Sequence, residues 1–183
     1  MIKPDGWIRE MAGKGMIKPF ADEGVREGVI SFGVSSYGYD MRLADVYRKL
    51  SPDDRHLIDP KTFQLDRLEE IRASEIRIPP NEFVIGRSLE YFRIPRDILT
   101  LCFGKSTYAR CGIVINVTPF EPEWEGYATL SISNTGPAPV RLYSGEGIAQ
   151  IVFLASDSPC ERSYADKKGR YQAQQDITLP ADR

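Results

Sequence analysis

Apolar and polar positions follow a strand-like pattern along most of this chain. They alternate at residues 37–43, 82–86 and 128–133, with the period of two that is typical of half-buried β-strands. Further apolar runs of strand length lie at residues 98–103, 113–117, 140–143 and 147–153. Turn signals separate these runs, among them Pro-Pro-Asn at 79–81 and Asn-Thr-Gly-Pro at 134–137. Many short strands with frequent turns predict a mainly β fold, a distorted barrel or jelly roll, without βαβ units.

Helical signal is concentrated at the N-terminus. Trp7, Ile8 and Met11 share one face of a short predicted helix over residues 7–11, which Asp5 can cap and Gly13 can end. We see no internal repeat and no linker, so the chain is predicted to form a single domain over residues 1–183.

The tail, residues 160–183, differs in composition from the rest. It is polar, rich in Lys, Asp and Gln, and carries Tyr164 and Tyr171 on either side of Gly169. Two interpretations stay open on composition: a frayed terminus, or a flexible C-terminal flap whose aromatic and amide side chains close on a ligand.

Composition narrows the function classes. The chain is 42% hydrophobic and 27% charged, which is normal for a soluble domain. The net charge of −2 gives no basic excess for binding nucleic acid. No apolar run approaches the ~20 residues of a membrane span, and no leader opens the chain. We therefore expect a cytoplasmic protein with neither a nucleic acid nor a membrane as partner.

Cysteine and histidine are too sparse for several common active sites. Cys102, Cys111 and Cys160 are odd in number and not at ligand spacing, which suggests reduced thiols. His56 is the only histidine and lies in a polar stretch, where a surface role is expected. The ligand motifs of the usual zinc deaminases and a histidine-dependent triad are thus missing from the sequence.

Residues 104–112 hold the densest group of candidate binding side chains. Lys105 and Arg110 are cations that suit phosphate oxygens. Ser106 and Thr107 can cap a short helix and donate to an anion. A phosphate cradle and a solvated turn between strands are both compatible with this composition.

A P-loop is excluded for the same segment. Walker A spacing requires a glycine five residues before Gly104, and Leu99 occupies that position.

Seven segments in order resemble one known family over nearly the whole chain. They are SSYGYD at 35–40, EYFRIP at 90–95, GKSTYARCG at 104–112, NVTP at 116–119, EPEWEG at 121–126, GIAQ at 147–150 and YQAQ at 171–174. Together they are similar to the dCTP deaminase family, a branch of the trimeric dUTPase-like superfamily. The resemblance implies a dUTPase-like barrel that forms homotrimers, with nucleotide sites between neighbouring subunits. It also implies conversion of dCTP to dUTP and ammonia without zinc, with Mg²⁺ bound to the triphosphate and dTTP as a further ligand.

The resemblance also assigns site residues. The implied nucleotide-binding positions are Lys105, Ser106, Thr107, Tyr108, Ala109, Arg110, Glu121, Thr129, Leu130, Ser131, Gln150, Tyr164 and Gln174. Of these, Ser106, Arg110 and Ser131 fall at catalytic positions. The mainly β fold, the short N-terminal helix and a flap at residues 160–183 agree with this family.

One position departs from the family in a way that bears on the chemistry. The family's acid/base glutamate lies in a Thr-Leu-Glu context, and here residues 129–131 are Thr-Leu-Ser. A carboxyl group with a raised pKa can take a proton from water and deliver it to the leaving nitrogen. The hydroxyl of Ser131 does neither near neutral pH. In the tail, Ala173 and Arg170 stand where glycine and lysine are usual in the family.

Three functions follow from this departure and stay open on the sequence. Another carboxylate, Glu121 or Glu125, acts as the base of a working deaminase. Alternatively, the chain binds dCTP or dTTP but deaminates it poorly or not at all, as a nucleotide sensor or assembly partner. In the third, the site carries out a different reaction on the same ligand class, such as hydrolysis of dUTP to release pyrophosphate.

Overall fold

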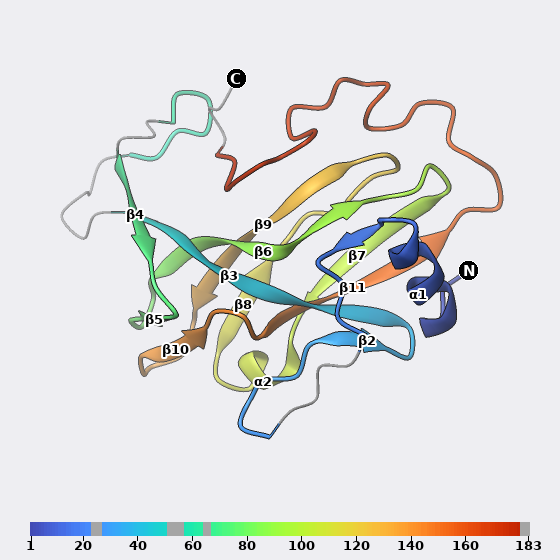
Figure 1. Cartoon of the computed structure of the whole chain (residues 1–183). Coiled ribbons are helices and arrows are strands. Elements are labelled where there is room, and N and C mark those ends of the chain that lie inside the picture. The colour runs from blue at the N-terminus through green and yellow to red at the C-terminus, as the bar shows by residue number, and fades with distance from the viewer. Residues whose placement is uncertain (23–26, 51–56, 64–66, 180–183) are drawn as a thin grey trace.

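The computed structural model describes residues 1–22, 27–50, 57–63 and 67–179 (Figure 1). His56, for which a surface role is expected, lies outside the described residues. The elements in chain order are α1 Asp5–Gly13, β1 Ile17–Lys18, β2 Gly33–Ser35, β3 Gly38–Leu50, β4 Leu68–Arg72, β5 Glu75–Ile78, β6 Phe83–Arg93, β7 Ile98–Gly104, α2 Ser106–Ala109, β8 Ile113–Asn116, β9 Glu125–Asn134, β10 Val140–Tyr143 and β11 Gly147–Ala155.

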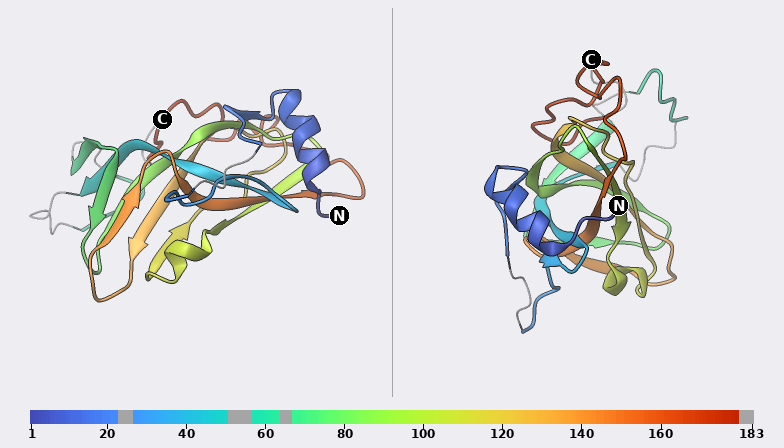
Figure 2. Two further views of the ribbon diagram at one scale, coloured as in Figure 1. Left: turned by 60° about the horizontal axis from the view of Figure 1, so that its bottom comes forward. Right: turned by 90° about the vertical axis from the view of Figure 1, so that its right-hand side faces the viewer.

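Within the described residues nine strands form one antiparallel sheet, with β7, β11, β3, β6, β9 and β8 as successive neighbours. β1 pairs with β6, β2 and β4 pair with β3, and β5 and β10 form a separate two-stranded antiparallel sheet. The two ends of the main sheet approach each other at Gly104, where an added Cβ would lie 3.1 Å from Ile115 Cγ1. The sheet therefore curls into a nearly closed barrel (Figures 1 and 2). The predicted mainly β, barrel-like fold is confirmed.

Strand β9 shows how the sequence pattern sets the two faces of the sheet. Leu130 and Ile132 are fully buried in the barrel core, whereas Thr129 and Ser131, which alternate with them, are only partly buried. Successive side chains of a strand point to opposite faces. The apolar positions of β9 therefore fill the core, and the hydroxyl positions face outward beneath the tail.

The strand predictions are confirmed except at their ends, but the sequence pattern missed four strands. These are β1, β2, β4 and β5, which are at most five residues long. β4 reads Leu-Glu-Glu-Ile-Arg, and adjacent charges conceal the alternation of an edge strand.

The short N-terminal helix is confirmed, but its predicted cap is wrong. Pro4 occupies the N-cap position and makes no side-chain capping bond. Asp5 is instead the first helical residue, and its carboxylate pairs with Arg9 one turn later at 2.6 Å. Asp5 thus lies where a negative charge favours the helix N-terminus, and hydrogen bonds to its carboxylate from Arg9 and from the backbone N–H of Gly6 lower its pKa.

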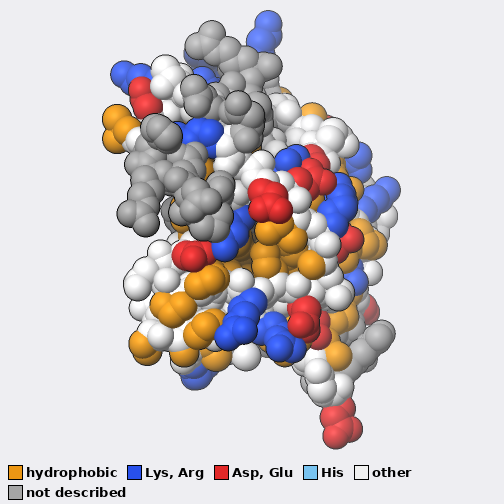
Figure 3. All heavy atoms as spheres, turned by 90° about the vertical axis from the view of Figure 1, so that its left-hand side faces the viewer, with side chains coloured by type: hydrophobic (Ala, Val, Ile, Leu, Met, Phe, Trp, Pro, Cys, Tyr) orange, Lys and Arg blue, Asp and Glu red, His pale blue; other side chains and the backbone are white. Residues whose placement is uncertain are grey.

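The tail after β11 returns across the sheet above β6 and β9, and α1 lies at one end of the barrel with the N-terminus (Figures 1 and 2). On the face in Figure 3, side chains of both charges are interspersed around a hydrophobic hollow. Cys102, Cys111 and Cys160 are free thiols. Among the described residues, no helix is long and apolar enough to cross a membrane.

Candidate functional site

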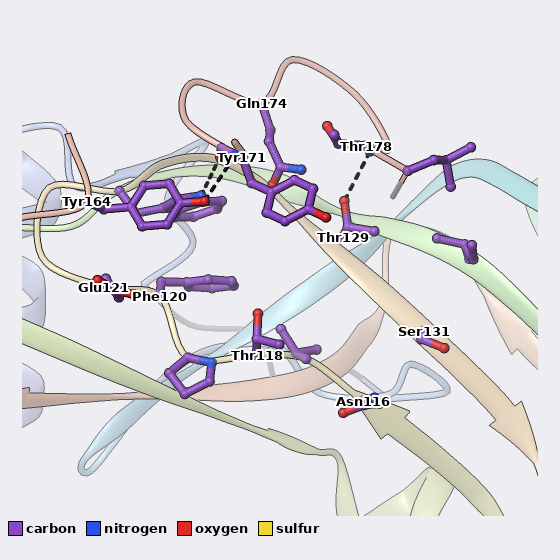
Figure 4. A pocket seen from close by; sticks show the side chains of 15 residues that line it. Asn116, Thr118, Phe120, Glu121, Thr129, Ser131, Tyr164, Tyr171, Gln174 and Thr178 are labelled. Atoms are coloured by element: carbon purple, nitrogen blue, oxygen red, sulfur yellow. Dashed lines mark hydrogen bonds between the residues drawn. The ribbon is translucent and has the colours of Figure 1, made fainter. Parts of the chain in front are cut away.

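A cavity of about 300 Å³ lies between β9 and the returning tail (Figure 4). Its floor comes from β9 and from the segment that follows β8, and its roof comes from the tail. The lining residues are Ile85, Asn116, Val117, Thr118, Pro119, Phe120, Glu121, Trp124, Thr129, Ser131, Tyr164, Tyr171, Gln174, Thr178 and Leu179. An aromatic and apolar lining with a few polar groups is typical of a small-molecule site.

Ser131 is held in the cavity floor by strands on both sides. In the sheet register it lies opposite Ile85 of β6 and Asn116 of β8. Both neighbours also line the cavity. The backbone at this position is therefore fixed by pairing on two sides, and the serine hydroxyl is the group that β9 presents here.

Glu121 carries the only carboxylate among the described residues that line the cavity. Its Oε2 accepts a bond of 2.7 Å from Nζ of Lys167 in the tail. In Figure 4, Glu121 lies at one side of the pocket and Ser131 at the other. Glu125 does not line the cavity, and its carboxylate pairs with Arg93 at 3.0 Å. Neither carboxylate occupies the place of the Ser131 side chain.

Specific hydrogen bonds join the tail to the start of β9 and to the segment before it. Nε1 of Trp124 donates to the carbonyl of Tyr171 at 2.7 Å. The N–H of Tyr171 in turn donates to the hydroxyl of Tyr164 at 3.0 Å (Figure 4). The N–H of Tyr127 donates to the carbonyl of Gln174 at 3.0 Å. Over the described part of the tail, these contacts contradict a frayed terminus, and the tail covers the cavity in this structure.

Two backbone conformations allow this close approach. Gly126 has φ of 147°, and an added Cβ would lie 2.9 Å from the backbone nitrogen of Gln174. Ala173 has φ of 57°, a left-handed conformation that costs a residue with a side chain about 1–2 kcal/mol. Ala173 is therefore accommodated in this conformation of the tail at an energetic cost.

The segment from Lys105 to Arg110 lies outside this cavity. Ser106, Thr107, Ala109 and Arg110 are exposed on and beside the short helix α2. Ser106 and Thr107 do not cap it, because Lys105 is the N-cap residue and makes no side-chain capping bond. Arg110 donates from Nη1 to the carbonyl of Ser106 at 3.0 Å.

Tyr108 anchors α2 to the barrel. Its side chain is buried, its hydroxyl accepts a bond of 3.1 Å from the N–H of Tyr143, and burial raises its pKa to about 12. Its ring therefore packs beneath α2, while the exposed side chains of the helix face outward.

The predicted site residues therefore fall into two groups within one chain. Glu121, Thr129, Ser131, Tyr164 and Gln174 line the cavity. The α2 segment and Gln150, at neighbouring ends of β7 and β11, form the second group.

Leu130 belongs to neither group by its side chain, which is fully buried in the core. Asn116, Thr118, Tyr171 and Thr178 line the cavity and are absent from the residues predicted to bind. The turn after β8 and the apolar residues near the chain end are the signals that could have indicated them. Among the described residues, no group of three or more His, Cys, Asp or Glu side chains is placed to hold a metal ion.

Comparison with known proteins defines the class of protein. The fold is similar to that of a 2′-deoxycytidine 5′-triphosphate deaminase from Agrobacterium tumefaciens, with a TM-score of 0.66 and 21% identity over 85% of this chain and 48% of that one. The profile of the dCTP deaminase-like family matches residues 2–156, so the chain belongs to that family. It is 59% identical to a dCTP deaminase of Acidobacterium capsulatum and 55% identical to one of Paramagnetospirillum magneticum, each over 98% of both chains.

Proposed function

We propose that this protein is a slow dCTP deaminase that converts dCTP and water to dUTP and ammonia. The observation that carries the proposal is the cavity in which Thr129 and Ser131 of β9 lie beneath Gln174 of the closed tail. The full-length similarity to proteins named dCTP deaminase supports the same substrate.

The reaction adds water to C4 of the cytosine ring and expels ammonia. A proton must leave the water, and protons must reach N3 and the departing nitrogen. Ser131 can hold a water by hydrogen bonding, but its hydroxyl does not carry the proton at neutral pH. Glu121 is engaged by Lys167 away from Ser131. We therefore expect dCTP to bind well and to react slowly.

The triphosphate is proposed to lie against the exposed face of α2. Arg110 there offers a planar fork of donors that suits phosphate oxygens. Mg²⁺ arrives with the nucleotide, bound through the phosphates, and offsets part of their charge. The deamination is proposed to proceed without zinc.

The α2 segment and Gln150 do not line the cavity of their own chain, which supports a site completed by a second copy. We propose that the protein forms a homotrimer in which the α2 segment of one subunit meets the cavity of its neighbour. Mixed subunits test this arrangement. Combining Arg110→Ala chains with Gln174→Ala chains should restore dCTP binding at a fraction of the sites, whereas sites contained in one chain would stay inactive in any mixture.

Product analysis tests the function. The protein is incubated at high concentration with dCTP and Mg²⁺, and ammonia and dUTP are measured. Slow, equimolar release of both is expected, with loss of activity in Arg110→Ala and retention in the presence of a zinc chelator. Formation of dUMP and pyrophosphate from dUTP would instead identify a pyrophosphatase.

A second function is supported by the serine itself. A site that binds dCTP or dTTP without turnover would act as a nucleotide sensor or as a partner in mixed assemblies. It predicts a raised melting temperature in millimolar nucleotide, as mass action requires for any ligand that binds the folded state, with no ammonia released. Ammonia release that depends on Arg110 would exclude this function.

A further inference from the structure

The hairpin of β2 and β3 contacts two predicted nucleotide-binding residues from outside the cavity. Oδ2 of Asp40 in β3 lies 2.6 Å from Nζ of Lys105, and the side chains are only 16% and 11% exposed. At the end of β2, Oγ of Ser35 accepts a bond of 3.0 Å from Nε2 of Gln150. One short segment thus binds side chains from two distant parts of the chain.

The backbone brings these residues together. Asp40 lies opposite Gln150 in the ladder of β3 and β11. The N–H of Lys105 donates to the carbonyl of Ile148 at 3.0 Å. β3, β11 and the start of α2 therefore converge where the ion pair forms.

Two glycines make this junction tight. A Cβ at Gly38 would lie 2.8 Å from the carbonyl oxygen of Ile151 and 3.1 Å from Cγ of Gln150. A Cβ at Gly147 would lie 3.2 Å from Cδ of Lys105 and would overlap the carbonyl of Ser31. The stem of the lysine is therefore confined against backbone, and its ammonium group is directed toward Asp40.

We propose that Asp40 and Ser35 are positioning residues that hold Lys105 and Gln150, and with Lys105 the start of α2. Lys105 is then an anchor whose charge Asp40 already balances, and the free positive charge for a phosphate comes from the exposed Arg110. This inference rests on the proposed nucleotide site for its ligand, but the anchoring itself does not.

Replacing Asp40 separates this role from the obvious alternative. If Asp40 competed with phosphate for Lys105, Asp40→Asn would release the lysine and tighten dCTP binding. If Asp40 positions Lys105, the same change leaves a largely buried ammonium without its counter-charge, and α2 keeps its attachment through Tyr108 but loses the one at its start. We expect the Kd for Mg·dCTP, measured by titration calorimetry, to rise at least tenfold. An unchanged or lower Kd would overturn the proposal.

A measurement without nucleotide tests the anchor directly. Amide hydrogen exchange over residues 105–112 should speed up at least tenfold in Asp40→Asn, and unchanged exchange would overturn the proposal. Glu10→Gln is the matched control, because it removes one carboxylate from an exposed pair with Lys14 that also spans 2.6 Å, and it should change neither quantity.

A double variant keeps the test valid if Asp40→Asn folds poorly. Asp40→Asn with Lys105→Met removes both charges, so no buried charge is left unpaired. Positioning predicts that its Kd exceeds that of the unchanged protein at least tenfold, because the contact that holds Lys105 is lost in either variant. A Kd equal to that of the unchanged protein would contradict it. If the unchanged protein binds no dCTP, the proposed function fails, and the exchange result still decides the anchoring.

Discussion

Gly169 is the position at which one methyl group should open the tail. A Cβ at Gly169 would overlap ring atoms of Tyr164, so Gly169→Ala forces the ring or the turn to move. The hydroxyl of Tyr164 holds the N–H of Tyr171 at 3.0 Å, and the carbonyl of Tyr171 is held by Trp124 at 2.7 Å. The substitution should therefore break two of the bonds that hold the roof of the cavity in place.

The magnitude follows from those two bonds. Each contributes about 1 kcal/mol net, so closing the tail should lose about 2 kcal/mol, or roughly 30-fold in the open population. Lys167, Lys168 and Arg170 are tryptic sites within this tail. When opening is fast, cleavage follows the open population, and we expect trypsin to cut Gly169→Ala roughly 30 times faster at these sites.

Gly6→Ala is the matched control, because an added Cβ there meets nothing within 4 Å. Circular dichroism should show an intact barrel in both variants. Equal rates of tail cleavage in Gly169→Ala and in the unchanged protein would refute the argument that this turn closes the cavity.

Two further predictions concern titratable groups. Burial raises the pKa of Cys102 to about 12. At pH 8 a thiol reagent should therefore modify the exposed Cys111 rapidly and Cys102 only after unfolding. Rapid modification of Cys102 in the folded protein would contradict this prediction. The backbone N–H of Ser163 and the Arg96 guanidinium lower the pKa of Asp166. Because the folded pKa is lowered, the stabilisation is present above the ordinary carboxyl pKa and is lost as the pH falls below about 4. Tail amides should then lose more of their protection from exchange than amides in β9, and Asp166→Asn should remove this pH dependence of tail protection.

The sequence could predict which side chains face the core and which face outward, because this depends on the local alternation of apolar and polar residues. Leu130 and Ile132 are in the core, and Thr129 and Ser131 face the cavity, as alternation in β9 requires. The order of the strands depends on contacts between residues far apart in the chain, such as Gln150 with Asp40. Periodicity carries no information about such pairs, so the strand order could not be predicted this way.

The candidate site shows the same limit. The residue types at 105–110 were enough to predict a group of cations for binding phosphate. The partner of Lys105, however, lies 65 positions earlier in the chain, and this pairing engages the charge of the lysine. The closed tail depends on Trp124 meeting the carbonyl of Tyr171, which no local pattern indicates. Residue types thus predicted the chemistry of the site, and tertiary contacts decided which groups are available for it.

The most direct test of the proposed function compares the rate of dCTP deamination with serine and with glutamate at position 131. Ammonia release from Mg·dCTP is measured for the unchanged protein, for Ser131→Glu and for Ser133→Glu, a control on the same face of β9 that does not line the cavity. Since a positioned acid/base contributes about 10²–10⁴-fold, Ser131→Glu should gain a factor in that range and Ser133→Glu should gain none. Equal rates in the unchanged protein and Ser131→Glu would contradict the account, because the proton carrier would then lie elsewhere.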